Sequence, residues 1–371
     1  MVQIARQGER VIGKAEGFSS SYREAREKFL ASVKAAGLAV QSHIHPEKGR
    51  DGEALAMDVA IDGPADADRL VIITSACHGV EGYCGTGIQV FALHDEQWRA
   101  KASEAGVAVM YIHALNPYGF SHIRRTTHEN VDLNRNFRDY AQPLEPNLLY
   151  REVHELLLPG SWPPDAGNVA AVDSFIATRG QDAWQAAISG GQPEFADGLF
   201  FSGHGPTWSN LTFREVLRRH ARRASRIAWI DIHTGLGPSG HGERIYAGQD
   251  DKGAVTRARD WWGQQVTSIY DGSSTSAKLT GMAFAAVYEE CQQAEYTGIA
   301  MEYGTQPILQ VLHALRAEHW LNLHRDAPKP LAAAIRQQMM DAFYTDTDGW
   351  KVQVIDQARE AMFQAVDGLM N

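Results

Sequence analysis

The chain alternates short apolar runs with polar, helix-forming stretches, and this alternation limits the folds that it can adopt. Two early runs, residues 37–44 (GLAVQSHI) and 53–61 (EALAMDVAI), are suited to a hairpin at the start of a sheet. Four later runs are rich in branched residues: RLVIITSA, VAVMYIHAL, RIAWIDIH and TGIAMEYG. The pattern predicts an α/β fold with a mixed, largely parallel twisted sheet and helices on both faces.

One long segment, at about 141–226, interrupts the alternation. It is helix-like, is broken by Pro, Gly and Trp, and contains no clear core strand. We therefore predict a single domain over residues 1–371 with a helical and loop insertion at about 141–226. Within the insertion lies the loop FSGHGPTWSN. We expect this loop to line or cover a cleft through His204, Trp208 and Asn210.

Composition argues against several classes of function. A net charge of −10 argues against a general nucleic-acid binder, because phosphate contacts need clustered positive charge. The basic run at 213–226 is interpreted as a solvated helix face. No segment approaches the ~20 apolar residues of a membrane-spanning helix. Three cysteines are too few for a disulfide framework or a thiolate zinc site, so we expect a reducing, cytoplasmic setting.

Polar side chains stand at the ends of the four branched runs. His78 and Glu81 follow the first run, and His113 lies near the end of the second. His233 ends the third run and Glu302 lies near the end of the fourth. Because function collects at the carboxyl ends of strands in open α/β sheets, we expect these side chains to converge on one edge.

Two imidazoles and one carboxylate, from His78, Glu81 and His233, make up a ligand set used by catalytic zinc sites with an open fourth position. We predict one Zn²⁺ per chain, with Glu302 as a general base and acid and Asp231 as a partner that orients a histidine. The alternative interpretations are a satisfied core histidine for His78 or His233 and a structural ion pair for Glu302. Three further histidines are interpreted as packing or supporting residues: His113, His204 and His241.

A second cluster lies at residues 116–137, NPYGFSHIRRTTHENVDLNRNF. Its Asn134–Arg135 pair and its Arg124–Arg125 doublet are suited to a cationic pocket, because arginine forks bind carboxylates bidentately. The alternative is a polar loop with surface ion pairs. Two other polar residues of the loop are interpreted as holding its shape: Asp132 and Asn136.

The order of these elements resembles the zinc metallocarboxypeptidases of the carboxypeptidase A clan. The elements are HxxE, NPxG, an arginine-containing loop, DxNRN, a strand-end His and a strand-end Glu. The clan also includes the aspartoacylase and succinylglutamate desuccinylase amidohydrolases, and the chain is most similar to a bacterial branch of carboxypeptidase-like proteins. The resemblance covers roughly residues 70–140 and 226–306.

By this resemblance, the zinc ligands correspond to His78, Glu81 and His233, and the general acid and base corresponds to Glu302. The residues that bind the substrate carboxylate correspond to Asn134 and Arg135. The arginine that polarises the scissile carbonyl corresponds to Arg125, with Arg124 as the alternative. The clan also has a substrate-binding tyrosine, for which the candidates are Tyr246, Tyr270, Tyr288 and Tyr296.

The resemblance implies a zinc-dependent hydrolase that cleaves an amide bond next to a free carboxylate. Its substrate is a small peptide, as for a carboxypeptidase, or an N-acyl amino acid, as for a deacylase. The insertion favours a walled pocket and small substrates. A non-catalytic binding protein that has kept the fold is the hypothesis from another class, and the presence of all three presumed ligands and of Glu302 argues against it.

Overall fold

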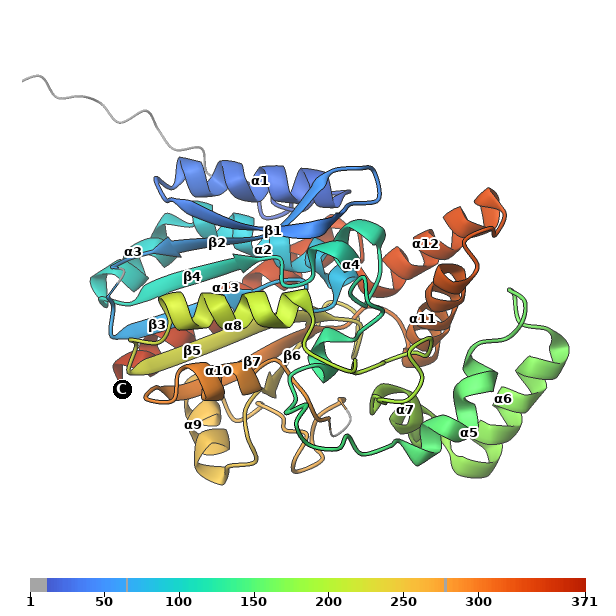
Figure 1. Cartoon of the computed structure of the whole chain (residues 1–371). Coiled ribbons are helices and arrows are strands. Elements are labelled where there is room, and N and C mark those ends of the chain that lie inside the picture. The colour runs from blue at the N-terminus through green and yellow to red at the C-terminus, as the bar shows by residue number, and fades with distance from the viewer. Residues whose placement is uncertain (1–11, 65, 277–278) are drawn as a thin grey trace, which may run out of the picture.

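A seven-stranded twisted sheet runs through the centre of the molecule (Figure 1). The computed structural model describes residues 12–64, 66–276 and 279–371, so residues 1–11 of the predicted domain lie outside the described residues. The strand order is β1-β2-β4-β3-β5-β7-β6. The strands are β1 Val40–Lys48, β2 Ala54–Asp62, β3 Arg69–Thr74, β4 Ala108–His113, β5 Arg226–Thr234, β6 Gly242–Tyr246 and β7 Glu295–Tyr303.

The four middle strands β4, β3, β5 and β7 are parallel, whereas β1, β2 and β6 pair antiparallel with their neighbours. The predicted mixed, largely parallel sheet and its opening hairpin are therefore confirmed. The strand order reverses beside β3, because β4 lies on one side of it and β5 on the other. Crevices at such reversals are where open α/β sheets bind ligands.

Helices cover both faces of the sheet (Figure 1). One face carries α1 Tyr22–Ala35, α2 Gly82–His94, α3 Glu96–Glu104, α9 Lys252–Trp262 and α13 Asp348–Met370, and the other carries α8 Trp208–His220 and α10 Ala285–Glu290. The remaining helices lie toward the carboxyl ends of the strands: η1 Gly79–Glu81, α4 Pro117–His122, η2 Leu133–Arg135, α5 Leu148–Leu157, α6 Ala166–Arg179, α7 Gln181–Ser189, α11 Ile308–Leu323 and α12 Lys329–Phe343. Every helix in the described part of the chain is too short or too polar to cross a membrane.

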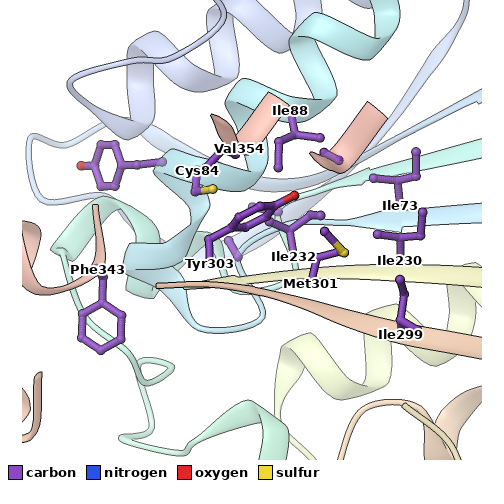
Figure 2. Close-up of a cluster of buried hydrophobic side chains, with 14 of the residues drawn as sticks. Ile73, Cys84, Ile88, Ile230, Ile232, Ile299, Met301, Tyr303, Phe343 and Val354 are labelled. Carbon is purple, nitrogen blue, oxygen red and sulfur yellow. The ribbon is translucent and has the colours of Figure 1, made fainter. Parts of the chain in front are cut away.

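Successive side chains of the central strands enter two different cores, because they point to opposite faces of the sheet. Figure 2 shows Ile230, Ile232 and Met301 packed in the core on the α2 and α13 side. The alternate residues of the same strands face α8 and α10, where Trp229 is buried. By this alternation, His233 and Glu302 belong to the face that carries α8 and α10. They lie opposite one another where β5 pairs with β7.

Three helices of the segment at 141–226 stand apart from the sheet (Figure 1). These are α5, α6 and α7, and α6 has no buried residue. The chain then returns to the sheet, where α8 contacts β2 and α10. We therefore propose that the insertion into the single domain ends before α8, and that the basic run in α8 belongs to a covering helix.

The loop after β3 crosses the backbone of α4 at Gly79, directly after His78. A Cβ atom at Gly79 would lie 2.0 Å from the carbonyl carbon of Gly119. We expect Gly79→Ala to lower the free energy of unfolding by about 1–3 kcal/mol, because the two backbones must separate. Urea denaturation measures this, with Gly160→Ala as the control because a Cβ atom there meets nothing within 4 Å. Equal stability of the two variants would contradict the prediction.

Candidate active site

Three buried side chains converge where β3 and β5 end: His78, Glu81 and His233. The Nδ1 atoms of His78 and His233 each lie 2.9 Å from a different carboxylate oxygen of Glu81. The two Nδ1 atoms are 3.3 Å apart. Tetrahedral zinc with bonds of ~2.0–2.1 Å places its ligand atoms roughly 3.3 Å apart, so these donors fit such an ion with little movement.

Each of the two histidines has a carboxylate against its other ring nitrogen. Asp231 Oδ2 lies 2.8 Å from His233 Nε2, and Asp132 Oδ1 lies 3.4 Å from His78 Nε2. Carboxylates in this position orient a metal-binding imidazole and fix its tautomer. Asp132 also accepts the N–H of Asn134, as expected for a residue that holds the loop, but its position beside His78 was not predicted. Only the tertiary fold brings Asp132 to His78.

Arg125 and Asp132 require opposite tautomers of His78. Arg125 Nη2 lies 2.7 Å from His78 Nε2 and can only donate, so this contact needs an unprotonated Nε2. The Asp132 carboxylate can only accept, so it needs a proton on Nε2. A metal at Nδ1 leaves the proton on Nε2 and therefore favours Asp132 as the partner.

A second group of candidate donors consists of Cys77, Asp231 and His233. Burial raises the pKa of the Cys77 thiol well above its usual value, which disfavours the thiolate that a metal needs. Asp231 is already engaged with His233 Nε2. The set that contains His78 and Glu81 is therefore the better candidate.

The carboxyl groups of the site are held in different charge states. Burial raises the pKa of Glu81, but His78 and His233 lower it further, to about 2. Burial also raises the pKa of Asp132. This effect is outweighed by Arg125 and other nearby positive groups, which hold the pKa of Asp132 well below its usual range. In Glu302, burial and the Glu81 carboxylate raise the pKa to about 8. Glu302 can therefore exchange a proton near neutral pH.

Glu302 lies beside the metal donors without joining them. It faces His233 across the paired strands, and its Oε1 accepts the backbone N–H of Leu236 at 3.0 Å. This bond fixes the carboxyl group at the carboxyl edge of β7.

Two consecutive arginines point to different parts of the molecule. Arg125 donates from Nε to Asp132 Oδ2 at 2.9 Å and lines the cavity with the metal donors. Arg124 instead forms a buried ion pair with Glu318 of α11, at 2.7 Å. Arg124 does not line the cavity, so we propose Arg125 and not Arg124 for a role on substrate.

Arg135 is a buried cation that lines the same cavity. Its Nε and Nη2 donate to the carbonyl of Ser189, at 3.2 and 2.6 Å. Among the described residues, no carboxylate lies within 4.0 Å of its guanidinium. Burial lowers the pKa of Arg135 to about 10, and Asp132 partly offsets this effect. An anionic group of a ligand would complete this environment.

The cavity encloses about 1020 Å³ of space, including its open mouth. Beside the charged groups, its lining includes Asn134, whose Oδ1 accepts the N–H of Ala283 at 2.8 Å. Of the four candidate tyrosines, Tyr246 alone lines it. His113 does not, because its ring is stacked on Phe29 in the core at 4.8 Å.

The insertion contributes to the cavity through residues that were not predicted: Gln185, Ser189 and Phe200. The expected contacts from the loop at 201–210 are wrong. Trp208 packs on His45 at 4.5 Å, His204 bonds the carbonyl of Pro193, and Asn210 donates to Asn136. Asn136 also donates to the carbonyls of residues 202 and 205, so it ties the loop at 201–210 to the loop at 116–137.

Residues 18–357 match the protein family described as "Protein of unknown function (DUF2817)". The chain belongs to this family. No curated protein matches this DUF2817 member in sequence. Bovine thrombin-activatable fibrinolysis inhibitor, solved with tick carboxypeptidase inhibitor, is similar in structure at 10% identity and a TM-score of 0.50, covering 96% of this chain and 99% of its own.

A metallo-carboxypeptidase from Pseudomonas aeruginosa has 14% identity and a TM-score of 0.43, with coverage of 93% of this chain and 69% of its own. A metallo-carboxypeptidase from Burkholderia cenocepacia has 12% identity and a TM-score of 0.40, with coverage of 88% and 68%. The likeness to the bovine protein confirms that this DUF2817 protein has a carboxypeptidase-like fold.

The ion pair between Arg124 and Glu318 makes a prediction about stability. Arg124→Met should lower the free energy of unfolding by about 3–5 kcal/mol, because Glu318 is left buried without its partner. Denaturant titration measures this, with Arg179→Met as the matched control. Arg179 pairs with Glu152 while both side chains are about half exposed, and such pairs contribute less than about 1 kcal/mol. Similar losses in both variants would show that the buried pair is not special.

Proposed function

We propose that this DUF2817 protein is a zinc-dependent hydrolase that cleaves an amide bond next to a free carboxylate. The observation that carries this proposal is the convergence of three metal donors, each imidazole backed by a carboxylate. Glu302, the buried Arg135 and the partly buried Arg125 share their cavity. A protein that only binds ligands would need no proton-exchanging carboxyl group beside the donors.

In this proposal His78, Glu81 and His233 hold the ion, while Asp132 and Asp231 fix the two rings. When bound, zinc supplies a Lewis acid that polarises an oxygen and makes water a nucleophile at neutral pH.

Glu302 moves the protons. Hydrolysis adds the hydroxyl of water to the acyl carbon and breaks the C–N bond, so one proton of water must reach the departing nitrogen. Glu302 accepts that proton at its carboxylate and then donates it to the amine. Burial raises the pKa of Glu302 and so favours the protonated form that donates to the amine.

The two arginines divide the recognition of substrate. Arg125, held by Asp132 beside His78, orients the carbonyl of the scissile amide. Arg135 and Asn134 bind the free carboxylate, because a guanidinium fork matches two carboxylate oxygens. Both a peptide with a free C-terminus and an N-acyl amino acid present these two groups.

Metal content and turnover should separate the roles of His78 and Glu302. His78→Ala should lose zinc and activity together. Glu302→Gln should keep zinc and fold but lose about 10²- to 10⁴-fold in kcat, because a positioned acid–base group is absent. Metal analysis and hydrolysis assays measure both, with His204→Ala as the control outside the cavity. Full zinc content in His78→Ala would refute the ligand assignment, and loss of zinc in Glu302→Gln would make Glu302 a ligand.

The carboxylate-binding role of Arg135 predicts a dependence on the free acid. Arg135→Lys keeps a positive charge but loses the fork, so kcat/KM for free-acid substrates should fall by about 10- to 100-fold, as expected for lost charge-assisted hydrogen bonds. The C-terminal amides of the same substrates should change much less. Paired assays on acids and amides test this, and an equal loss on both would limit Arg135 to a structural role.

A further inference from the structure

One helix turns an apolar face into the cavity. Residues Ile308, Val311, Leu312 and Leu315 of α11 line it, at the i, i+3, i+4 and i+7 spacing of a single helical face. Leu309, elsewhere on the helix surface, is 44% exposed. Phe343 from α12 and Phe200 from the insertion line the cavity as well. We call these six residues the α11 wall.

The α11 wall adjoins the groups proposed to react. A Cβ atom at Gly235 would lie 2.9 Å from the ring of Phe343 and 3.8 Å from Val311, and the next residue, Leu236, donates to Glu302. At the other end of the wall, the Phe200 ring lies 4.7 Å from the guanidinium of Arg125. The α11 wall therefore borders Glu302, the proposed proton-transfer group, and Arg125, which is proposed to bind the carbonyl.

Within the carboxylate-binding pair, Asn134 is attached to a different wall. Asn134 accepts the N–H of Ala283, and the neighbouring Met282 and Phe284 line the cavity with Ile245 and Ala300. A substrate whose carboxylate lies at Asn134 and Arg135 would place its amino-acid side chain against this second apolar wall. The α11 wall is then left for the acyl group on the other side of the amide.

Phe200 is held in place against a conformational preference. Its φ of 52° lies in the left-handed region, which is unfavourable for a bulky residue. The insertion holds it there, because the N–H of Gln192 donates to the carbonyl of Phe200 and the N–H of Ser202 donates to the carbonyl of Gln192. The ring also lies 5.6 Å from the guanidinium of Arg135. Backbone strain of this kind gathers at ligand sites.

Every charged residue that lines the cavity already has a partner or a role at the centre: His78, Glu81, Arg125, Arg135, Asp231, His233 and Glu302. Among the described residues, the α11 wall has no charged side chain. A carboxylate or an ammonium group placed against it would lose its hydration without gaining a partner, which is costly.

We infer, building on the hydrolase function proposed above, that the α11 wall binds an uncharged, apolar acyl chain. The substrates are then N-acylated apolar amino acids, in preference to peptides with a free amino group beside the scissile bond and to N-succinyl amino acids.

Matched substrates test this inference with the zinc-loaded enzyme. N-hexanoyl-phenylalanine and norleucyl-phenylalanine differ only by the ammonium group, and the first should have the higher kcat/KM by at least tenfold. From N-acetyl- to N-hexanoyl-phenylalanine, kcat/KM should rise about fourfold for each methylene until the wall is covered. The inference would be overturned if norleucyl- or N-succinyl-phenylalanine were cleaved faster than N-hexanoyl-phenylalanine. It would also be overturned if kcat/KM did not depend on the length of the acyl chain.

Two lysine substitutions on α11 form a matched pair. Leu312→Lys should reduce kcat/KM for N-hexanoyl-phenylalanine by at least tenfold and raise the relative rate on N-succinyl-phenylalanine. Leu309→Lys, at the exposed position, should leave both rates unchanged. If Leu312→Lys has a lowered Tm, Val311→Thr is used in its place because it keeps the side-chain volume. Val311→Thr should weaken the dependence of kcat/KM on acyl-chain length. Equal effects of the substitutions at Leu312 and Leu309 would contradict the assignment of the wall.

A binding measurement separates this inference from the proposed hydrolase function. Calorimetry on zinc-loaded Glu302→Gln measures the affinity for the same acyl series without turnover. Affinity that rises with acyl-chain length supports the assignment of the α11 wall. If the unsubstituted protein nevertheless hydrolyses none of these compounds, that result overturns the hydrolase proposal alone. Affinity that is flat along the series would overturn the inference while leaving the hydrolase function to the activity assays.

Discussion

The pairing of β5 with β3 on one side and β7 on the other holds the site together. Nine residues of β5 pair in register with β7, from Arg226 with Glu295 to Thr234 with Tyr303. This ladder fixes His233 opposite Glu302, and the parallel β3 delivers the loop that carries His78 to the same edge. His233 and Glu302 are therefore positioned by backbone hydrogen bonds within the sheet, whereas His78 and Glu81 follow β3 and are held by the bonds of Gly79 and Val80 to the carbonyls of Arg125 and Arg124.

The same edge concentrates negative charge. Four buried carboxyl groups, from Glu81, Asp132, Asp231 and Glu302, share the site with the guanidinium groups of two arginines. If all four are ionised and the histidines are neutral, the arginines leave two negative charges without compensation. Part of this excess is relieved by the raised pKa of Glu302 and by that of His233, which burial lowers but Asp231 and Glu81 raise well above its usual value. A divalent cation between the donors would relieve the rest, which explains how so many carboxylates can be buried together.

The sequence predicted the parts of the site that depend on strands. Branched apolar runs identified the four parallel strands, and the residues at or just after their ends included the three candidate metal donors and Glu302. The edge strand β6 was missed because its sequence, GERIY, is short and carries two charged residues. Contacts made across the fold were also beyond prediction: Asp132 meets His78, and Phe200 meets Arg125, at sequence separations that no local pattern records. The loop at 201–210 was misjudged because its Pro and Gly residues indicate a defined loop but not the direction that it faces.

The opposite directions of Arg124 and Arg125 limit how the chain can change in length. Their carbonyls accept the N–H groups of Val80 and Gly79, so the loop is aligned residue by residue with η1. Removal of one residue upstream, between β4 and this point, would shift the alignment. Arg125 would then take the place of Arg124 beside Glu318, and Thr126 would replace the arginine beside His78. Insertions and deletions at residues 116–132 are therefore incompatible with this alignment, and substitutions are free only at Glu129, the one exposed residue of the loop. The loop is therefore constrained both in its number of residues and, because most of them are buried, in their identity.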